Sequence, residues 1–426
     1  MRVALLVIVT IVSWQCYAEE PLLLEAQPDV LVVKSKDPMD RWGATELWDS
    51  FRVSNVASEI VSIRPAFPQS ELSWGSRDEL FPASHYFTVR LKKGTSLSNA
   101  IREISAFGSV ESVQPDYWLS DPLITFSDPK FKDQWYVQKL KIDEAWEVAT
   151  GKGVSVADVE SGFDTEHPDL KNQFDKEKSY DYDPKTDDAH KVNDNKRSHG
   201  TPVCGIIAAQ ANNNLFGVGV AFDAKLIGSQ MANTMDIHST ESVWTVNAAR
   251  AILGSAKNGA SVVLIEKQIP SLESSVERVK VIYDAIKATV AGGVAVVVPA
   301  GNFGTELKEE AAQEDTGSIV VGATMQNDNV AFFSNYGTRV NVAAPGENVY
   351  STQEDGAETS SFGGTSSASA IVAGVVALVR SANMKLSPKE LREVLVETGM
   401  ALAGERKVGV LVQAGPAVRQ AQKMAR

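Results

Sequence analysis

Residues 363–380 read GGTSSASAIVAGVVALVR, in which two glycines and a cluster of serines lead into an apolar run. The run predicts a buried helix over Ser367–Arg380. A serine at the start of such a helix has its hydroxyl at the end that favours negative charge. Ser366 is therefore a candidate nucleophile. On this motif alone, an ordinary N-cap serine is the alternative.

The sequence on either side alternates between apolar strands and helices. This alternation predicts a mostly parallel sheet with helices on both faces, where catalytic groups collect at the carboxyl ends of the strands. Ser387 and Pro388 have the types expected at the N-cap and first position of a last amphipathic helix. Strands are expected at Val154–Val159, Ala260–Ile265, Val294–Pro299, Ile319–Ala323 and Val340–Ala343, and helices at Thr201–Ala209 and Ser275–Ala291.

Three more motifs place polar groups at such strand ends or helix starts. Glu160 ends a buried strand, where an unpaired carboxylate is costly. His199 opens a helix of small residues, although a lone histidine is more often structural. Asn302 follows the strand that ends at Pro299, and its side chain is an amide donor. Together with Ser366 these residues supply an acid, a base, a nucleophile and a donor for an oxyanion.

The order carboxylate, histidine, serine along the chain is that of subtilisin. With this order and these motifs, residues 127–426 resemble a subtilase, a subtilisin-like serine endopeptidase with an N-terminal propeptide. The resemblance extends to the segments FSNYG, VAAPG and GVLVQAG at residues 333–337, 342–346 and 409–415. It implies an α/β three-layer fold with a mostly parallel sheet, preceded by a small α+β ferredoxin-like propeptide domain.

The resemblance also implies the roles of the candidate residues. Ser366 is the nucleophile, His199 the general base, and Asn302 a donor to the oxyanion. The implied activity is hydrolysis of peptide bonds in protein or peptide substrates through an acyl-enzyme intermediate. No cofactor is required for this chemistry. The enzyme is expected to process its own propeptide, which acts as an intramolecular inhibitor.

The sequence departs from the family at Glu160, where subtilases have aspartate. Glutamate keeps the charge and adds one methylene, and it replaces aspartate in other enzymes with a Ser-His-acid triad. A working triad with Glu160 is the favoured interpretation. One alternative is Asp158, which lies on the same face of the strand and needs a shifted register. A second alternative is a non-catalytic binding protein with the subtilisin fold.

A second departure is the charged pair Glu266 and Lys267 at the end of the strand Ala260–Ile265. In subtilases this segment pairs with the substrate backbone and forms a wall of the primary pocket. One hypothesis is that Glu266 favours a basic side chain before the scissile bond. The favoured alternative is that Glu266 and Lys267 pair with each other or point to solvent.

Calcium and cysteine are secondary features. Asp169 and Asn213 fall where many subtilases supply ligands to a structural calcium, and oxygen ligands suit this ion. One residue is inserted in the loop of Asn213, so the metal ligands stay undecided. The chain has two cysteines, Cys16 and Cys204. Cys204 replaces a small residue on the histidine's helix and is expected to be a buried thiol.

The N-terminal region is expected to hold two segments. Residues 1–18 contain the apolar run Val3–Val12 and end in Cys16-Tyr17-Ala18, as in a signal peptide cleaved before Glu19. Residues 19–126 show two βαβ patterns, which predict the ferredoxin-like unit. Asp128–Trp146 is interpreted as a linker into the peptidase domain, residues 127–426.

The composition excludes several classes of protein. The net charge of −13 disfavours nucleic acid as a partner. Two cysteines exclude a disulfide scaffold, and only Cys204 remains after cleavage at Glu19. The run Val3–Val12 is too short for a membrane span. The protein is expected to be a secreted, extracellular or periplasmic monomer without a membrane span.

Overall fold

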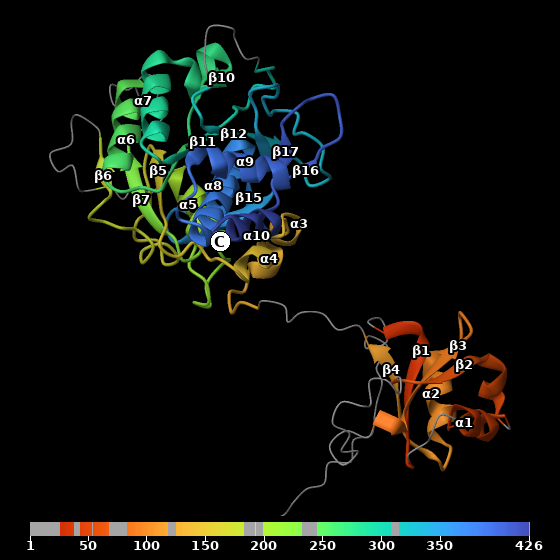
Figure 1. Cartoon of the computed structure of the whole chain (residues 1–426). Helices are drawn as coiled ribbons and strands as arrows, with labels where there is room; N and C mark the ends of the chain where they lie inside the picture. The colour runs from red at the N-terminus through yellow and green to blue at the C-terminus, as the bar shows by residue number, and fades with distance from the viewer. Residues whose placement is uncertain are drawn as a thin grey trace, which may run out of the picture. The chain divides into compact units, whose positions relative to one another are not determined.

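The computed structural model describes residues 26–37, 43–52, 54–67, 83–117, 125–182, 192, 199–231, 245–307 and 315–425. The chain divides into two compact units, Met1–Leu123 and Ile124–Arg426, called unit 1 and unit 2 below (Figure 1). The expected signal peptide, residues 1–18, lies outside the described residues.

The described part of unit 1 is an antiparallel sheet with two α-helices, in the order expected of a ferredoxin-like unit. Its strands are arranged β2-β3-β1-β4, so each helix joins two strands that have another strand between them in the sheet. Alternate residues of β3, such as Phe87 and Val89, are buried against both helices. The elements are β1 (Ala26–Ser35), α1 (Gly43–Phe51), β2 (Ile60–Pro65), β3 (Tyr86–Leu91), α2 (Leu97–Ser105) and β4 (Val110–Tyr117).

Unit 2 is built on a nine-stranded sheet within the described residues, in the order β16-β17-β13-β12-β11-β8-β5-β7-β6. Neighbouring strands are parallel except β16 and β17. The strands of this sheet are β5 (Ser155–Glu160), β6 (Tyr180–Asp181), β7 (Lys225–Gln230), β8 (Val262–Ile265), β11 (Ala295–Pro299), β12 (Ile319–Thr324), β13 (Val342–Pro345), β16 (Met400–Ala401) and β17 (Val410–Leu411).

Two antiparallel pairs and eight helices complete the described part of unit 2. The pairs are β9 (Gln268–Ile269) with β10 (Ser274–Ser275) and β14 (Val349–Gln353) with β15 (Ala357–Phe362). The helices are α3 (Tyr136–Lys139), α4 (Ile142–Trp146), α5 (Gly200–Ala208), α6 (Thr245–Lys257), α7 (Lys280–Ala291), α8 (Gly364–Ala382), α9 (Pro388–Thr398) and α10 (Ala414–Met424).

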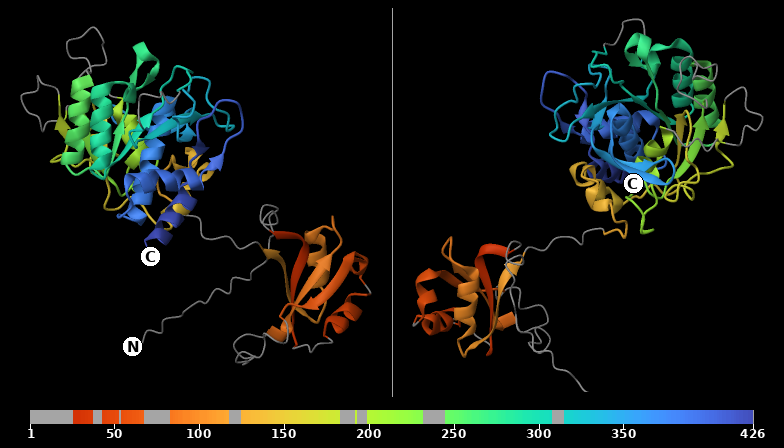
Figure 2. Two further views of the ribbon diagram at one scale, coloured as in Figure 1. Left: turned by 45° about the horizontal axis from the view of Figure 1, so that its top comes forward. Right: turned by 180° about the vertical axis from the view of Figure 1, so that it is seen from behind.

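The burial of the strands shows that the sheet is covered on both faces. Val262 and Leu264 of β8 belong to the core formed with α5, α8 and α10, whereas Val263 and Ile265 belong to a second core under α6 and α7. Figures 1 and 2 show α6 and α7 side by side, on the other side of the sheet from α8. The expected three-layer α/β fold is therefore confirmed.

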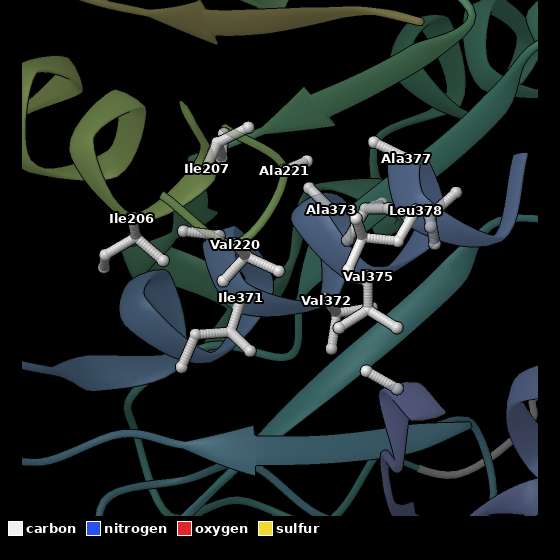
Figure 3. Close-up of a cluster of buried hydrophobic side chains, with 14 of the residues drawn as sticks. Ile206, Ile207, Val220, Ala221, Ile371, Val372, Ala373, Val375, Ala377 and Leu378 are labelled. Carbon is white, nitrogen blue, oxygen red and sulfur yellow. The ribbon is translucent and has the colours of Figure 1, made fainter. Parts of the chain in front are cut away.

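Helix α8 lies in the centre of the larger core. In Figure 3 its residue Ile371 lies beside Val220, and Ile206 of α5 and Val375 of α8 belong to the same core. Gly374 is required here, because a Cβ atom at this position would lie 2.6 Å from Cβ of Val220. Among the described residues α8 is the one helix long and apolar enough to cross a membrane, and 83% of its most apolar window is buried in this core.

The strand order reverses between β5 and β8. From β5 the chain builds β6 and β7 on one side, and it then crosses to β8 and builds the remaining strands on the other side. Such a reversal opens a crevice beyond the carboxyl ends of the two strands, which is where ligands bind in open α/β sheets. Here β5 ends at Glu160 and β8 at Ile265.

The interpretation of Asp128–Trp146 as a linker was wrong. The segment forms α3 and α4 and packs into the core of unit 2, where Tyr136 is fully buried. The indole N–H of Trp146 donates to the carbonyl oxygen of Val220 at 2.8 Å. Charged residues lie between these aromatic residues, so the sequence pattern did not indicate a buried segment. Strand β7 and helices α6 and α10 are elements that the sequence analysis did not predict.

Candidate active site

Glu160 is held at the end of β5 with its side chain fully buried. One carboxylate oxygen, Oε1, accepts a hydrogen bond of 2.8 Å from Nδ1 of His199. The other, Oε2, accepts from the hydroxyl of Ser161 at 2.8 Å and from the backbone N–H of the same residue. Both oxygens therefore have partners, and Oε1 faces the histidine.

His199 lies at the N-cap position of α5, with 27% of its side chain exposed. Burial by itself lowers the pKa of His199, but the charge of Glu160 and the hydrogen bond to it outweigh this effect, so the pKa lies above its usual value. Helix α5 approaches the segment that follows β5 closely at this point: a Cβ on Gly200 would lie 2.6 Å from the carbonyl oxygen of Gly162.

Ser366 is half-buried in the first turn of α8. Gly364 precedes it with φ of 84°, a conformation that favours glycine, and lets the chain turn from β15 into the helix. The backbone N–H groups of a first helical turn have no acceptor within the helix, so they are available to a developing negative charge.

Asn302 follows β11 and is fixed by contacts to two other segments. Its Oδ1 accepts from the backbone N–H of Thr365 at 2.8 Å and from the hydroxyl of Thr365 at 3.0 Å. Its own backbone N–H donates to Oε1 of Gln268 at 2.9 Å. A Cβ on Gly364 would lie 3.4 Å from Nδ2 of Asn302. The amide nitrogen therefore lies beside the turn that leads to Ser366.

The structure brings Glu160, His199, Ser366 and Asn302 to one edge of the sheet, at the ends of β5 and β11 and the starts of α5 and α8. Among the described residues no hydrogen bond joins His199 to Ser366. Catalytic hydrogen bonds are often long in the absence of substrate. Both residues interact with the carboxylate of Glu266, which places them around one common neighbour.

The expectation that Glu266 and Lys267 pair with each other or point to solvent was wrong. Glu266 is 4% exposed, and its Oε1 accepts a hydrogen bond from the hydroxyl of Ser369 on α8. Burial raises the pKa of Glu266 to about 7, against the opposing effects of His199 and Ser369. Lys267 instead reaches Glu160: its Nζ lies 2.6 Å from each carboxylate oxygen. Sequence reasoning missed this contact, since the two residues are 107 positions apart.

Asp158, the alternative carboxylate, faces α5, the helix that begins directly after His199. The thiol of Cys204 donates to its Oδ2 at 3.6 Å, while Oδ1 is buried without a partner among the described residues. Burial and the nearby charges of Glu160 and Glu266 hold the pKa of Asp158 well above its usual value. Burial likewise raises the pKa of Cys204, which is a fully buried thiol as expected.

Asp169 and Asn213, the two candidate calcium ligands, lie together. Nδ2 of Asn213 donates to Oδ1 of Asp169 at 2.6 Å. Oδ2 of Asp169 is buried and has no partner among the described residues. A second carboxylate, Asp128, accepts from the backbone N–H of Asn212 at 2.7 Å. Burial of Asp169 raises its pKa to about 7, and the negative charge of Asp128 adds to this rise. A buried carboxylate oxygen without a hydrogen-bond partner is suited to bind a cation directly. The described residues contain no group of three or more His, Cys, Asp or Glu side chains placed to bind a metal.

Comparisons with known proteins point to one family. Residues 151–415 match the model of the subtilase family. The chain is 32% identical over 281 residues to thermitase of Thermoactinomyces vulgaris, covering 66% of this chain and 93% of thermitase. It is 34% identical over 271 residues to subtilisin Savinase of Lederbergia lenta, covering 63% and 92%.

A longer alignment is made with an extracellular protease of Xanthomonas campestris pv. campestris, 30% identical over 344 residues. It covers 71% of this chain and 58% of that protease, so the chain spans less than two thirds of this relative's length. A solved protease structure from Pseudoalteromonas arctica matches 70% of this chain with a TM-score of 0.58 and 26% identity, over its full length. A cold-adapted subtilisin-like serine proteinase matches 62% of the chain and 90% of its own, with a TM-score of 0.52 and 22% identity, which shows the fold. The family predicted from the sequence is confirmed, and the chain belongs to the subtilase family.

Proposed function

We propose that the chain is a secreted serine endopeptidase that hydrolyses peptide bonds through an acyl-enzyme intermediate. The observation that supports this most directly is the hydrogen bond of 2.8 Å between Nδ1 of His199 and the buried carboxylate of Glu160. Because Nδ1 donates to Glu160, Nε2 is the nitrogen that can accept a proton, and it lies on the side of the imidazole away from Glu160.

In this mechanism His199 is the general base. Its Nε2 accepts the proton of the Ser366 hydroxyl as the Ser366 oxygen attacks the substrate carbonyl. Glu160 accepts from Nδ1–H, which fixes the tautomer and stabilises the imidazolium that forms. His199 then gives the proton to the leaving amine, and a water molecule repeats the sequence on the acyl-enzyme.

The negative charge on the tetrahedral intermediate needs donors that are already in place. Asn302 is fixed through its Oδ1 by Thr365, so its Nδ2 is the proposed side-chain donor. The backbone N–H groups at the start of α8 are the proposed second source. Both donors are positioned before substrate binds, and this preorganisation is what makes such a site effective.

Export and self-processing belong to the same proposal. Residues 1–18 act as a signal peptide, and the remainder of unit 1 acts as a propeptide that unit 2 removes. The relatives named above include an extracellular protease, which supports export. The substrates are proteins or peptides, and the enzyme acts as a monomer without nucleic acid or a membrane span.

The test is the intact mass of the protein expressed without residues 1–18, beside the Ser366→Ala variant. Wild type is expected to lose about 100 N-terminal residues, the size of one small domain, while Ser366→Ala stays whole. A wild type that stays whole and does not cleave a denatured protein substrate, with calcium present and between about pH 4 and 9, contradicts the proposal and favours a non-catalytic binding protein.

We also propose that Asp169 and Asn213 bind a structural calcium ion, with Asp128 close by. The unpartnered Oδ2 of Asp169 supports this assignment. The ion would stabilise the loop of Asn213 and take no part in the chemistry. In this structure Oδ1 of Asn213 accepts from the backbone N–H of Leu215 at 2.9 Å, so in this proposal the Asn213 side chain rotates and gives up its hydrogen bonds to Leu215 and Asp169 when its oxygen binds the ion.

A further inference from the structure

The side chain of Lys267 is directed into the candidate site by the backbone. Its N–H donates to the carbonyl oxygen of Ile265 at 3.0 Å, which forms a tight turn directly after β8. Strands β5 and β8 are parallel neighbours with Val159 opposite Ile265. The turn therefore places Lys267 across the end of β5, with 16% of its side chain exposed and its Nζ 2.6 Å from both oxygens of Glu160.

The surroundings of Glu160 are rich in acidic groups. Asp158 approaches from β5 itself, Glu266 from the end of β8, and His199 and Cys204 from α5. Helix α8 contributes the neutral hydroxyls of Ser366 and Ser369. Of the described groups named in this paragraph and around Glu160, Lys267 is the one lysine or arginine. A fully buried carboxylate without a cationic or hydrogen-bonding partner costs several kcal/mol.

We propose that Lys267 is a positioning residue of the catalytic site, which holds the long side chain of Glu160 ionised and directed at Nδ1 of His199. This inference rests on the proposed peptidase function and adds a fifth residue to Glu160, His199, Ser366 and Asn302. Glutamate has one more rotatable bond than aspartate, so its carboxylate needs more support to keep one orientation. The contact of Lys267 with both oxygens supplies that support.

The same contact has an electrostatic consequence for the base. Burial alone would raise the pKa of Glu160, but the charges of Lys267 and His199 hold it well below its usual value. The charge of Lys267 also opposes the upward shift that Glu160 gives to the pKa of His199. Lys267 thus keeps Glu160 charged and at the same time limits how strongly His199 holds a proton.

The test compares Lys267→Met, which keeps the length and removes the charge, with Lys267→Arg, which keeps the charge. Lys389→Met is the matched control, since Lys389 on α9 is 79% exposed. Lys267→Met is expected to lower kcat by up to roughly 100-fold, the effect of displacing a catalytic group by about 1 Å. In Lys267→Met the acidic limb of the kcat/KM profile is expected to move to higher pH by about one unit. Lys267→Arg is expected to recover most of kcat and the original limb.

A second readout does not depend on activity. In the Ser366→Ala background, which cannot cleave itself, the NMR titration of His199 is expected to shift to higher pH in Lys267→Met. If wild type is inactive but this shift is present, the proposed function fails while the electrostatic link stands. If wild type is active and Lys267→Met leaves both kcat and the His199 titration unchanged, Lys267 is not a positioning residue.

A variant that does not fold also has a defined meaning. Should Lys267→Met not fold, the double variant Glu160→Gln/Lys267→Met is expected to fold, because it removes both charges together. Thermal unfolding followed by circular dichroism reports this. Failure of the double variant to fold would overturn the proposal, since Lys267 would then be required for packing independently of Glu160.

Discussion

Asn302 and Thr365 are joined by two hydrogen bonds, in which Oδ1 of Asn302 accepts from both the backbone N–H and the hydroxyl of Thr365. Thr365 is the residue directly before Ser366 and is fully buried. The loop after β11 and the first turn of α8 are thus fixed to each other. The oxygen of the Asn302 amide therefore has a structural role, and Nδ2 is the donor that the proposed mechanism uses.

Aspartate at position 302 separates these two roles. Asn302→Asp keeps an acceptor for Thr365 and removes the donor, so we expect kcat to fall by roughly 100- to 1,000-fold with little change in KM. Asn302→Ala should lose as much. Steady-state kinetics with a chromogenic peptide measure this, and near-UV circular dichroism checks the fold. An Asn302→Asp enzyme with wild-type kcat would show that Nδ2 does not contact the oxyanion.

Glu160 should be sensitive to loss of its charge. Glu160→Gln keeps the shape but removes the anion that stabilises the imidazolium, so kcat is expected to fall by roughly 10,000-fold at neutral pH. Glu160→Asp shortens the side chain and should retain measurable activity. Burst kinetics with an active-site titrant separate slow turnover from a small active fraction. Full activity of Glu160→Gln would instead favour Asp158 as the functional carboxylate.

Glu266 should set part of the pH profile. His199 must be neutral to accept a proton, and its raised pKa places the acidic limb of kcat/KM above about 6.5, the ordinary histidine value. Ionised Glu266 contributes to that rise. Glu266→Gln removes the negative charge, lowers the pKa of His199, and is expected to move the limb to lower pH by up to about one unit. The exposed Glu393→Gln serves as control, and a limb that moves upward in Glu266→Gln would contradict the assignment.

Calcium should stabilise the protein most at alkaline pH. The raised pKa of Asp169, about 7, means that the folded state holds this proton more tightly than the unfolded chain. In chelator, this residue therefore makes the free energy of unfolding fall as the pH rises from about 4 to about 8. Calcium binds the ionised carboxylate, so its effect on Tm should be larger at pH 8 than at pH 5. Asp169→Asn should remove most of the increase in Tm that calcium gives. If calcium raises the Tm of this variant as much as that of wild type, the ion binds elsewhere.

Gly374 tests the packing of α8. Alanine is about 1 kcal/mol more favourable than glycine inside a helix. A Cβ at this position would nevertheless lie 2.6 Å from Cβ of Val220, and such overpacking costs about 1–3 kcal/mol. We expect Gly374→Ala to lower the free energy of unfolding measured in urea. An increase in the free energy of unfolding would mean that α8 and the segment of Val220 can move apart without loss of stability.

The central part of the fold was predictable because its strands are apolar on both sides. Runs such as Val262–Ile265 and Ala295–Pro299 are buried on two faces, as parallel strands covered by helices must be. Ser387 was expected to cap an amphipathic helix, and the structure shows its full capping box with Glu390 at the start of α9, although α10 rather than α9 is the last helix. Where local sequence and tertiary packing favour the same structure, the residues alone are sufficient.

The parts that were not predictable depend on contacts between distant segments. Trp146 is a core residue because its indole N–H donates to Val220 and its ring packs against Phe222, which are more than 70 positions away. Lys267 looks like a surface residue until the turn after β8 directs it over Glu160. The candidate residues of the site were found from motif order, but their electrostatic surroundings were not.

Helix α8 has a consequence for how activity is lost. Ser366 lies in its first turn, and from Ala368 to Val379 every residue is buried. Local fraying affects exposed segments with few apolar contacts, and Ser366 does not belong to such a segment. Displacing Ser366 requires the larger core to open, so heat inactivation and cooperative unfolding of unit 2 should follow the same curve. The fraction of activity that survives heating then reports the fraction of molecules that are still folded.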